Sequence, residues 1–189
     1  MATPSSSTER RRQATQNFRS TEKDSLIMEE FMKEALHEAK KAAGKGEVPI
    51  GAVITHQGKI IARGHNNVEA SKDATQHAEM IALKKAYKKL DAWRLTDCEL
   101  YVTMEPCPMC MGAINLSRIK NVYFGTSDEK AGACGSVIDI PACESLNHRV
   151  KVFKGMMEEE SKELLQDFFA GLRKRNKKRK EDQREKQEV

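Results

Sequence analysis

Long apolar runs, an even number of cysteines and an apolar stretch after the N-terminal arginines are all missing from this sequence. No stretch of 18 or more apolar residues occurs in the 189 residues, so no segment is expected to cross a membrane. Residues 1–19 contain three consecutive arginines but no apolar stretch after them, so they are not expected to act as a secretory signal. The five cysteines, an odd number, include one Cys-x-x-Cys pair, which favours metal binding over a disulfide framework. These absences favour a cytoplasmic protein.

Positive charge is concentrated at the two ends of the chain. Lys and Arg outnumber Asp and Glu by 9 to 4 in residues 171–189 and by 5 to 3 in residues 1–25, whereas residues 26–170 hold 19 against 21. Clustered Lys and Arg release counterions from a phosphate backbone, so the basic tail indicates an extended anionic partner such as nucleic acid. A merely solvated helix end explains the same charges equally well.

The length fits one domain with charged ends. Residues 1–24 are rich in Ser, Thr, Arg and Gln and lack apolar periodicity, which predicts a disordered leader. We expect the folded domain to span residues 25–178 and a charged tail to span residues 179–189.

Predicted strands alternate with predicted helices along the domain. Apolar residues at helical spacing predict helices over residues 26–43, from about 77 to 90, 106–118 and 156–180. Short β-rich runs predict strands at residues 49–55, 59–63, 100–104, 121–125 and 149–153. Residues 64–76 read as a polar loop. The alternation predicts an α/β sandwich around a single sheet.

Four residues form a candidate metal centre. Cys107 and Cys110 lie three residues apart at the start of a predicted helix, so both thiols point the same way, and the helix N-terminus favours their thiolate forms. A structural zinc site would need a fourth protein ligand, and neither another cysteine pair nor a His-x-x-x-His occurs. His77, at another predicted helix start, makes a third ligand and leaves one position for water, as in a catalytic zinc. Glu79 is then free to handle protons.

The order of these motifs resembles a known family. His-Ala-Glu on one helix and Pro-Cys-x-x-Cys on the next, with a strand between them, is similar to the signature of the cytidine and deoxycytidylate deaminase superfamily. Further segments look like those of bacterial tRNA-specific adenosine deaminases (the TadA family), namely residues 47–52, 64–66, 100–107, 117–119, 147–149 and 167–169. The resemblance covers roughly residues 26–178.

This resemblance implies a fold, a reaction and a cofactor. The implied fold is α/β, a three-layer αβα sandwich with a five-stranded mixed sheet and about five helices, as in cytidine deaminases. The implied reaction is hydrolytic deamination of adenosine to inosine at the wobble position of a tRNA anticodon. One Zn²⁺ per chain, held by His77, Cys107 and Cys110, would provide a bound hydroxide as the nucleophile, with Glu79 as the proton shuttle.

The resemblance also implies RNA-contacting residues and partners. Asn66 matches the position whose amide binds the flipped nucleoside, and Ala78 matches a backbone contact beside the base. The matching positions near the anticodon-loop backbone are Asp128, Asn147, His148, Phe169 and Arg173. The expected partners are a tRNA anticodon stem-loop and a second copy of the chain in a homodimer. No association with a membrane is expected.

Three other readings stay open on the sequence. A free nucleobase or nucleoside deaminase acting on guanine or cytidine would share the metal and the proton shuttle, although the basic tail favours RNA. A catalytically idle scaffold subunit is disfavoured by the intact Glu79. A zinc-stabilised binding module without activity is disfavoured by the missing fourth ligand.

Overall fold

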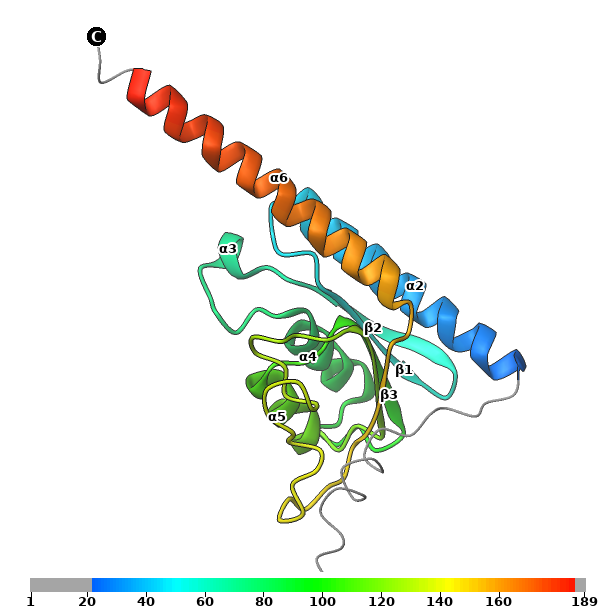
Figure 1. Ribbon diagram of the computed structural model, residues 1–189. Coiled ribbons are helices and arrows are strands. Elements are labelled where there is room, and N and C mark those ends of the chain that lie inside the picture. Colours follow the sequence, from blue (N-terminus) through cyan, green and yellow to red (C-terminus); the bar gives the residue numbers. More distant parts are fainter. Residues whose placement is uncertain (1–21, 186–189) are drawn as a thin grey trace, which may run out of the picture.

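A computed structural model describes residues 22–185 of the chain (Figure 1). The predicted leader lies outside the described residues except for its last three, which begin the first described helix. No helix in residues 22–185 is both long and apolar enough to cross a membrane. All five cysteines lie in this range, and no disulfide joins any two of them.

One sheet of five strands forms the centre of the fold. Its order is β2-β1-β3-β4-β5, where β1 spans Gly51–His56, β2 Lys59–His65, β3 Cys98–Met104, β4 Asn121–Thr126 and β5 Lys151–Lys154. The pairings β1·β2 and β1·β3 are antiparallel, and β3·β4 and β4·β5 are parallel. The predicted mixed sheet is confirmed, and the carboxyl ends of β3, β4 and β5 meet at one edge.

Five helices are described, and four of them cover the two faces of the sheet. They are α2 (Glu22–Gly44), α3 (Val68–Ser71), α4 (Ala78–Leu90), α5 (Pro108–Leu116) and α6 (Glu158–Glu185). Figure 1 shows α2 and α6 side by side on one face and α4 and α5 on the other. The predicted three-layer αβα sandwich is therefore confirmed.

Each face of the sheet has its own core. Between the sheet and α2, the rings of Tyr101, Tyr123 and Phe153 stack with centroids 4.7 and 4.8 Å apart, and Phe31 of α2 meets Tyr101 edge-on. The opposite core is aliphatic and includes Leu83 of α4, Ile114 of α5 and Leu100 of β3. Burial on both faces explains why the central strands are continuous apolar runs.

Two glycines let helices approach the sheet closely. A Cβ at Gly51 of β1 would lie 2.0 Å from the carbonyl oxygen of Ala35 in α2, and one at Gly64 of β2 would lie 2.2 Å from that of Ala78 in α4. Any side chain at either position would force the backbones apart. Gly64 therefore fixes where the first residue of α4 sits against the sheet.

The predicted elements differ from the observed ones mainly at their ends. The first helix begins at Glu22 rather than at residue 26, and the last extends to Glu185 rather than to 180. Residues 64–76, expected as a loop, contain α3. A helix of four residues is too short to show apolar periodicity in the sequence. It is stabilised by the buried Glu47, whose carboxylate accepts the backbone N–H groups of Glu69 and Ala70 at 3.1 and 2.8 Å.

Candidate active site

Three soft ligand atoms converge where α4 and α5 begin. The Nδ1 atom of His77 lies 3.7 Å from the Sγ of Cys107 and 3.5 Å from the Sγ of Cys110. All three ligand atoms lie within 4.8 Å of one another. The structure thus brings together the three residues that the sequence predicts as metal ligands.

Helix starts place these side chains. His77 is the N-cap of α4 and Cys107 the N-cap of α5, both with extended backbone angles, and Pro108 opens α5 without an N–H to satisfy. Cys110 follows in the first turn of α5 and is fully buried. The sequence analysis placed both thiols inside the first turn, whereas Cys107 sits at its cap. The two thiols still face the same point.

The donor set fits a zinc ion. With Zn–S bonds of about 2.3 Å and a Zn–N bond of about 2.0–2.1 Å, tetrahedral geometry places a nitrogen and a sulfur ligand about 3.6 Å apart. The two measured separations, 3.7 and 3.5 Å, agree with this spacing. One imidazole and two thiols also match the ligand preference of zinc, and three protein ligands leave one coordination position for a small molecule.

The two cysteines are strongly coupled. Hydrogen bonding from Cys110, together with that from His77, lowers the pKa of Cys107 to about 4. The neighbouring Cys107 and burial raise the pKa of Cys110, and the hydrogen bond to Cys107 raises the pKa of His77. A cation bound here would displace the remaining protons, because thiolates and a neutral imidazole are the binding forms.

Glu79 lies in the first turn of α4, two residues after His77. It is only 4% exposed. Burial raises the pKa of its carboxyl group, with weaker opposing effects from backbone hydrogen bonding and from His77. A carboxyl group with this environment exchanges protons nearer neutral pH than an exposed glutamate does, which suits general acid–base chemistry.

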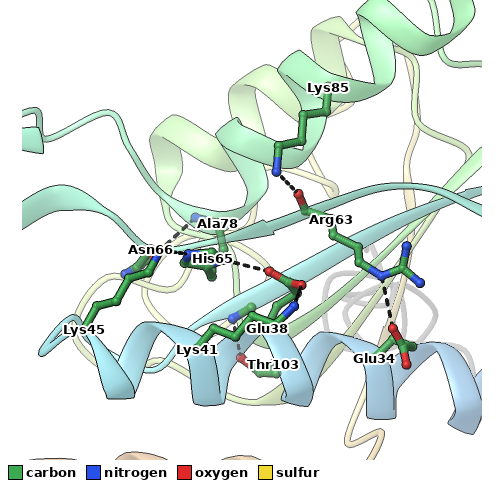
Figure 2. A network of polar contacts seen from close by, with 11 residues as sticks. Glu34, Glu38, Lys41, Lys45, Arg63, His65, Asn66, Ala78, Lys85 and Thr103 are labelled. Carbon is green, nitrogen blue, oxygen red and sulfur yellow. Dashed lines mark hydrogen bonds and ion pairs between the residues drawn. The ribbon is translucent and has the colours of Figure 1, made fainter. Parts of the chain in front are cut away.

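Asn66, at the end of β2, is held against the start of α4. Its Oδ1 accepts the backbone N–H of Ala78 at 2.9 Å (Figure 2). The backbone N–H of Asn66 donates to the carbonyl oxygen of Ile50 at 3.1 Å. The side chain is 5% exposed. The bond to Ala78 joins the two residues that the sequence analysis assigned to the nucleoside, and Ala78 directly follows His77.

A polar chain supports this corner from the side of α2 (Figure 2). His65 donates from Nδ1 to the buried Glu38 at 2.7 Å and accepts at Nε2 from Lys45 at 2.9 Å. Lys41 donates to the other oxygen of Glu38 at 2.7 Å. Burial alone would raise the pKa of Glu38, but the bonds from Lys41 and His65 outweigh it and lower the pKa. The network ties the end of β2 to α2.

Within residues 22–185, none of the remaining predicted RNA residues has a recorded bond to His77, Cys107 or Cys110. Asp128 accepts the N–H groups of Lys130 and Ala131 at 2.9 and 3.2 Å, which forms a turn. Asn147 is exposed. The ring of His148 bonds the carbonyl oxygen of Ile119 at 2.6 Å and so is turned into the protein. The proximity of these residues to RNA stays a prediction.

Phe169 and Arg173 lie on α6, and both are exposed. α6 runs beside α2 in the same direction, and Figure 1 shows its second half projecting beyond the sheet and past α3. The start of β1 adjoins the end of β3, since the N–H of Gly51 donates to Thr103 Oγ1 at 3.2 Å. The end of β3, from which the chain continues to Cys107, therefore lies at the same edge of the sheet as the start of β1. The second half of α6 projects past this edge.

The sequence analysis missed two buried glutamates near the site. Glu47 bonds the start of α3, and Glu105 bonds the loop that follows β4. Both fall in segments that supported the family resemblance, but their partners are 22 to 31 residues away in sequence. No local pattern marks a bond of that range.

Comparison with known proteins defines the class of enzyme. A family model described as MafB19-like deaminase matches residues 27–173. A solved guanine deaminase from Nitrosomonas europaea has a TM-score of 0.65 at 25% identity and covers 84% of this chain and 91% of its own. The chain has the fold of a deaminase and belongs to this class of enzyme.

Two more similar proteins narrow the family. The tRNA-specific adenosine deaminase of Bacillus subtilis (strain 168) is 50% identical over 147 residues, which are 78% of this chain and 91% of that protein. A solved structure from work on A-to-I editing by tRNA:A34 deaminases at the wobble position has a TM-score of 0.70 at 41% identity, covering 72% of this chain and 99% of its own. The chain belongs to the tRNA-specific adenosine deaminase family.

We predict that the purified protein binds one zinc per chain through the three converging ligands. Replacing both thiols, Cys107→Ala with Cys110→Ala, should abolish metal retention, because one imidazole alone holds zinc weakly. Elemental analysis of the dialysed protein measures the ratio. The matched control is Cys143→Ala, which removes an exposed thiol and should leave the ratio at one. Full zinc content in the double variant, or two zincs per wild-type chain, would contradict the assignment.

Proposed function

We propose that the protein deaminates adenosine to inosine at the wobble position of a tRNA anticodon by hydrolysis. The main support is the combination of the His77, Cys107 and Cys110 triad with 50% identity to the B. subtilis enzyme over 91% of that enzyme's length. The structural likeness to a tRNA:A34 deaminase exceeds that to the N. europaea guanine deaminase in both TM-score and identity.

The residues of the site divide the chemistry between them. His77, Cys107 and Cys110 would hold a zinc ion, which when bound supplies a water nucleophile at neutral pH. Glu79 accepts a proton from the attacking water, delivers it to N1 of the purine as C6 becomes tetrahedral, and helps protonate the departing ammonia. Its raised pKa suits a group that must both take and give a proton.

Asn66 and Ala78 orient the base beside the triad. The bond between them fixes the amide of Asn66, whose remaining N–H donors can reach a nucleoside that enters the site. A wobble base lies in a loop and is already unstacked, so little energy is needed to extrude it. Asp128, Asn147, His148, Phe169 and Arg173 would contact the surrounding loop backbone.

We also propose that the protein is a homodimer in the cytoplasm. Leu116 of α5 is 70% exposed, and Val137, Ile138 and Leu146 of the following loop are also exposed. This loop bonds α5, because Asn115 donates to the carbonyl oxygen of His148 at 2.7 Å. Exposed apolar residues from contacting segments support a protein interface, for which a second copy is the proposed partner. The unbridged cysteine pair suits a reducing compartment.

The basic half of α6 supports an RNA partner. Seven cations occupy residues 173–180, namely Arg173, Lys174, Arg175, Lys177, Lys178, Arg179 and Lys180, and all are exposed. Within the part of the chain that the structure describes, one ion pair is recorded for them, between Lys177 and Glu181 at 3.9 Å. Successive residues turn by about 100°, so these cations surround the helix and leave no apolar stripe for a protein groove. A phosphate backbone is the partner that fits such a helix.

The proposed substrate is tested with purified protein and an anticodon stem-loop that carries adenosine at the wobble position. We expect inosine at that position, and little turnover of free guanine, cytidine or adenosine, because the free compounds lack the loop contacts. Inosine mapping measures the reaction of the stem-loop, and ammonia release measures turnover of the free compounds. Efficient deamination of free guanine or cytidine, comparable with that of the stem-loop, would replace this function with that of a free-base or nucleoside deaminase.

Glu79→Gln is expected to keep the fold and one zinc per chain while losing at least about 100-fold in kcat, because the amide neither accepts nor donates the transferred proton. Steady-state kinetics on the stem-loop and elemental analysis measure the two quantities. Glu69→Gln, in the first turn of α3, serves as a control and should leave kcat unchanged. Loss of zinc from the Glu79 variant would make this carboxylate a ligand instead.

Truncation after Leu172 tests the basic half of α6. It should weaken stem-loop binding at low salt and flatten the plot of log affinity against log salt by roughly 0.7 to 0.9 for each phosphate contact removed. Zinc content should not change. The control Lys59→Gln removes a positive charge from the β1–β2 turn, at the opposite edge of the sheet, and should not alter the slope. If the plots for the full chain and the truncation superimpose, the basic residues only stabilise the C-terminal end of the helix through their charge.

A further inference from the structure

The carboxylate of Glu105 lies buried between the end of β3 and the loop of residues 127–137. It directly follows β3 and is only 3% exposed. Its Oε1 accepts the backbone N–H groups of Cys134 at 2.8 Å and Ser136 at 3.2 Å. Its Oε2 accepts the N–H of Asp128 at 3.0 Å and the hydroxyl of Ser136. One carboxylate therefore fixes both ends of the loop.

The loop is shaped to fit against this carboxylate. A Cβ at Gly132 would lie 2.4 Å from Cδ of Glu105 and 2.5 Å from the carbonyl oxygen of Asp128, so only glycine fits there. The next residue, Ala133, donates its N–H to the carbonyl oxygen of Pro106 at 2.9 Å. The loop thus contacts the two residues that immediately precede Cys107.

The recorded partners of Glu105 in the described chain are N–H and O–H donors of this loop, not a lysine or an arginine. A buried carboxylate without donors is costly, and bonds to a charged acceptor are stronger than bonds to a neutral one. The loop and the carboxylate therefore depend on each other. Asp128 lies at the first of the four bonds, so its position follows that of Glu105.

We propose that Glu105 is a positioning residue for RNA recognition. It holds residues 128–136 beside the segment that leads to Cys107, which places Asp128 where the backbone of an anticodon loop can meet it. This inference rests on the proposed function, since an RNA role for Asp128 is part of that proposal. Because Glu105 acts on the loop, its loss should affect substrate binding more than the chemical step.

The test compares Glu105→Gln with a control, Glu99→Gln, which lies in β3, the strand that Glu105 follows. Glu99 accepts bonds from Asn121 at 2.5 Å and Tyr101 at 3.1 Å and has no recorded bond to the loop. Glutamine at 105 keeps the size of the side chain but turns an NH₂ group toward N–H donors. Hydrogen exchange in residues 127–137 should become at least about tenfold faster in the Glu105 variant and stay unchanged in the control.

Kinetics on the stem-loop then separate the possible roles. For Glu105→Gln we expect KM to rise at least about tenfold, kcat to stay within about threefold of wild type, and zinc to remain at one per chain. An unchanged KM, or a fall in kcat alone, or loss of zinc would overturn the proposal, the last two because they point to Cys107 instead. Wild type that forms no inosine would remove the proposed function and the RNA role together, whereas an active wild type with an unaffected variant removes only the role of Glu105.

Gly132→Ala provides a second route if the Glu105 variant does not fold. It leaves the carboxylate in place and pushes the loop away from the other side of the same contact. The same rise in KM and the same faster exchange are expected. Gly44→Ala at the end of α2, where an added Cβ meets nothing within 4 Å, is the matched glycine control and should change neither quantity. Equal KM values for the two glycine variants would contradict the proposal.

Discussion

The site depends on two helices that begin at the same point. Three donor atoms within 4.8 Å of one another form a metal site only if the caps of α4 and α5 stay in register. Contacts next to the donors fix the start of α4, because Gly64 lets Ala78, the residue after His77, approach β2, and the bond from Ala78 to Asn66 holds the same point. A shift of 1 Å between the helices would be large compared with the tolerance of about 0.2 Å for a ligand distance. Packing of the sheet against α4 is therefore also a condition for the chemistry.

Four glutamates of the described chain are buried, and the groups around them differ. Glu38, Glu47 and Glu105 accept bonds from side chains or backbone N–H groups and join separate segments of the chain. At Glu38 these bonds lower the pKa, whereas at Glu79 burial dominates and raises it. The charged form of Glu38 is favoured, which suits anchoring, whereas the charged form of Glu79 is disfavoured, which suits proton transfer. The same residue type therefore fills different roles according to the donors around it.

The sequence predicts the ligands better than it predicts their supports. His77, Cys107 and Cys110 lie in short motifs at helix starts, where local periodicity and capping decide the structure. The five strands are likewise marked by apolar runs between turn residues. By contrast, α3, the bonds of Glu105 and the inward turn of the His148 ring depend on partners more than 20 residues away. The two ends of the fold differ from prediction for another reason: charged residues continue a helix without an apolar pattern to mark where it begins or stops.

The same fold occurs in a guanine deaminase and in a tRNA:A34 deaminase, so the fold alone does not fix the substrate. The N. europaea guanine deaminase has the same fold at a TM-score of 0.65, although only 25% of its residues are identical. A small base needs an enclosed pocket, whereas an anticodon loop needs an open edge with contacts beyond the base. Here the edge that carries the ligands is bordered by α3, by the loop anchored on Glu105 and by the projecting half of α6. The loop anchored on Glu105 contacts the two residues before Cys107, whereas α3 and the projecting half of α6 have no recorded bond to the donor residues within the described chain. These two segments can therefore change without disturbing the donor geometry, whereas a change in the loop would reach Cys107.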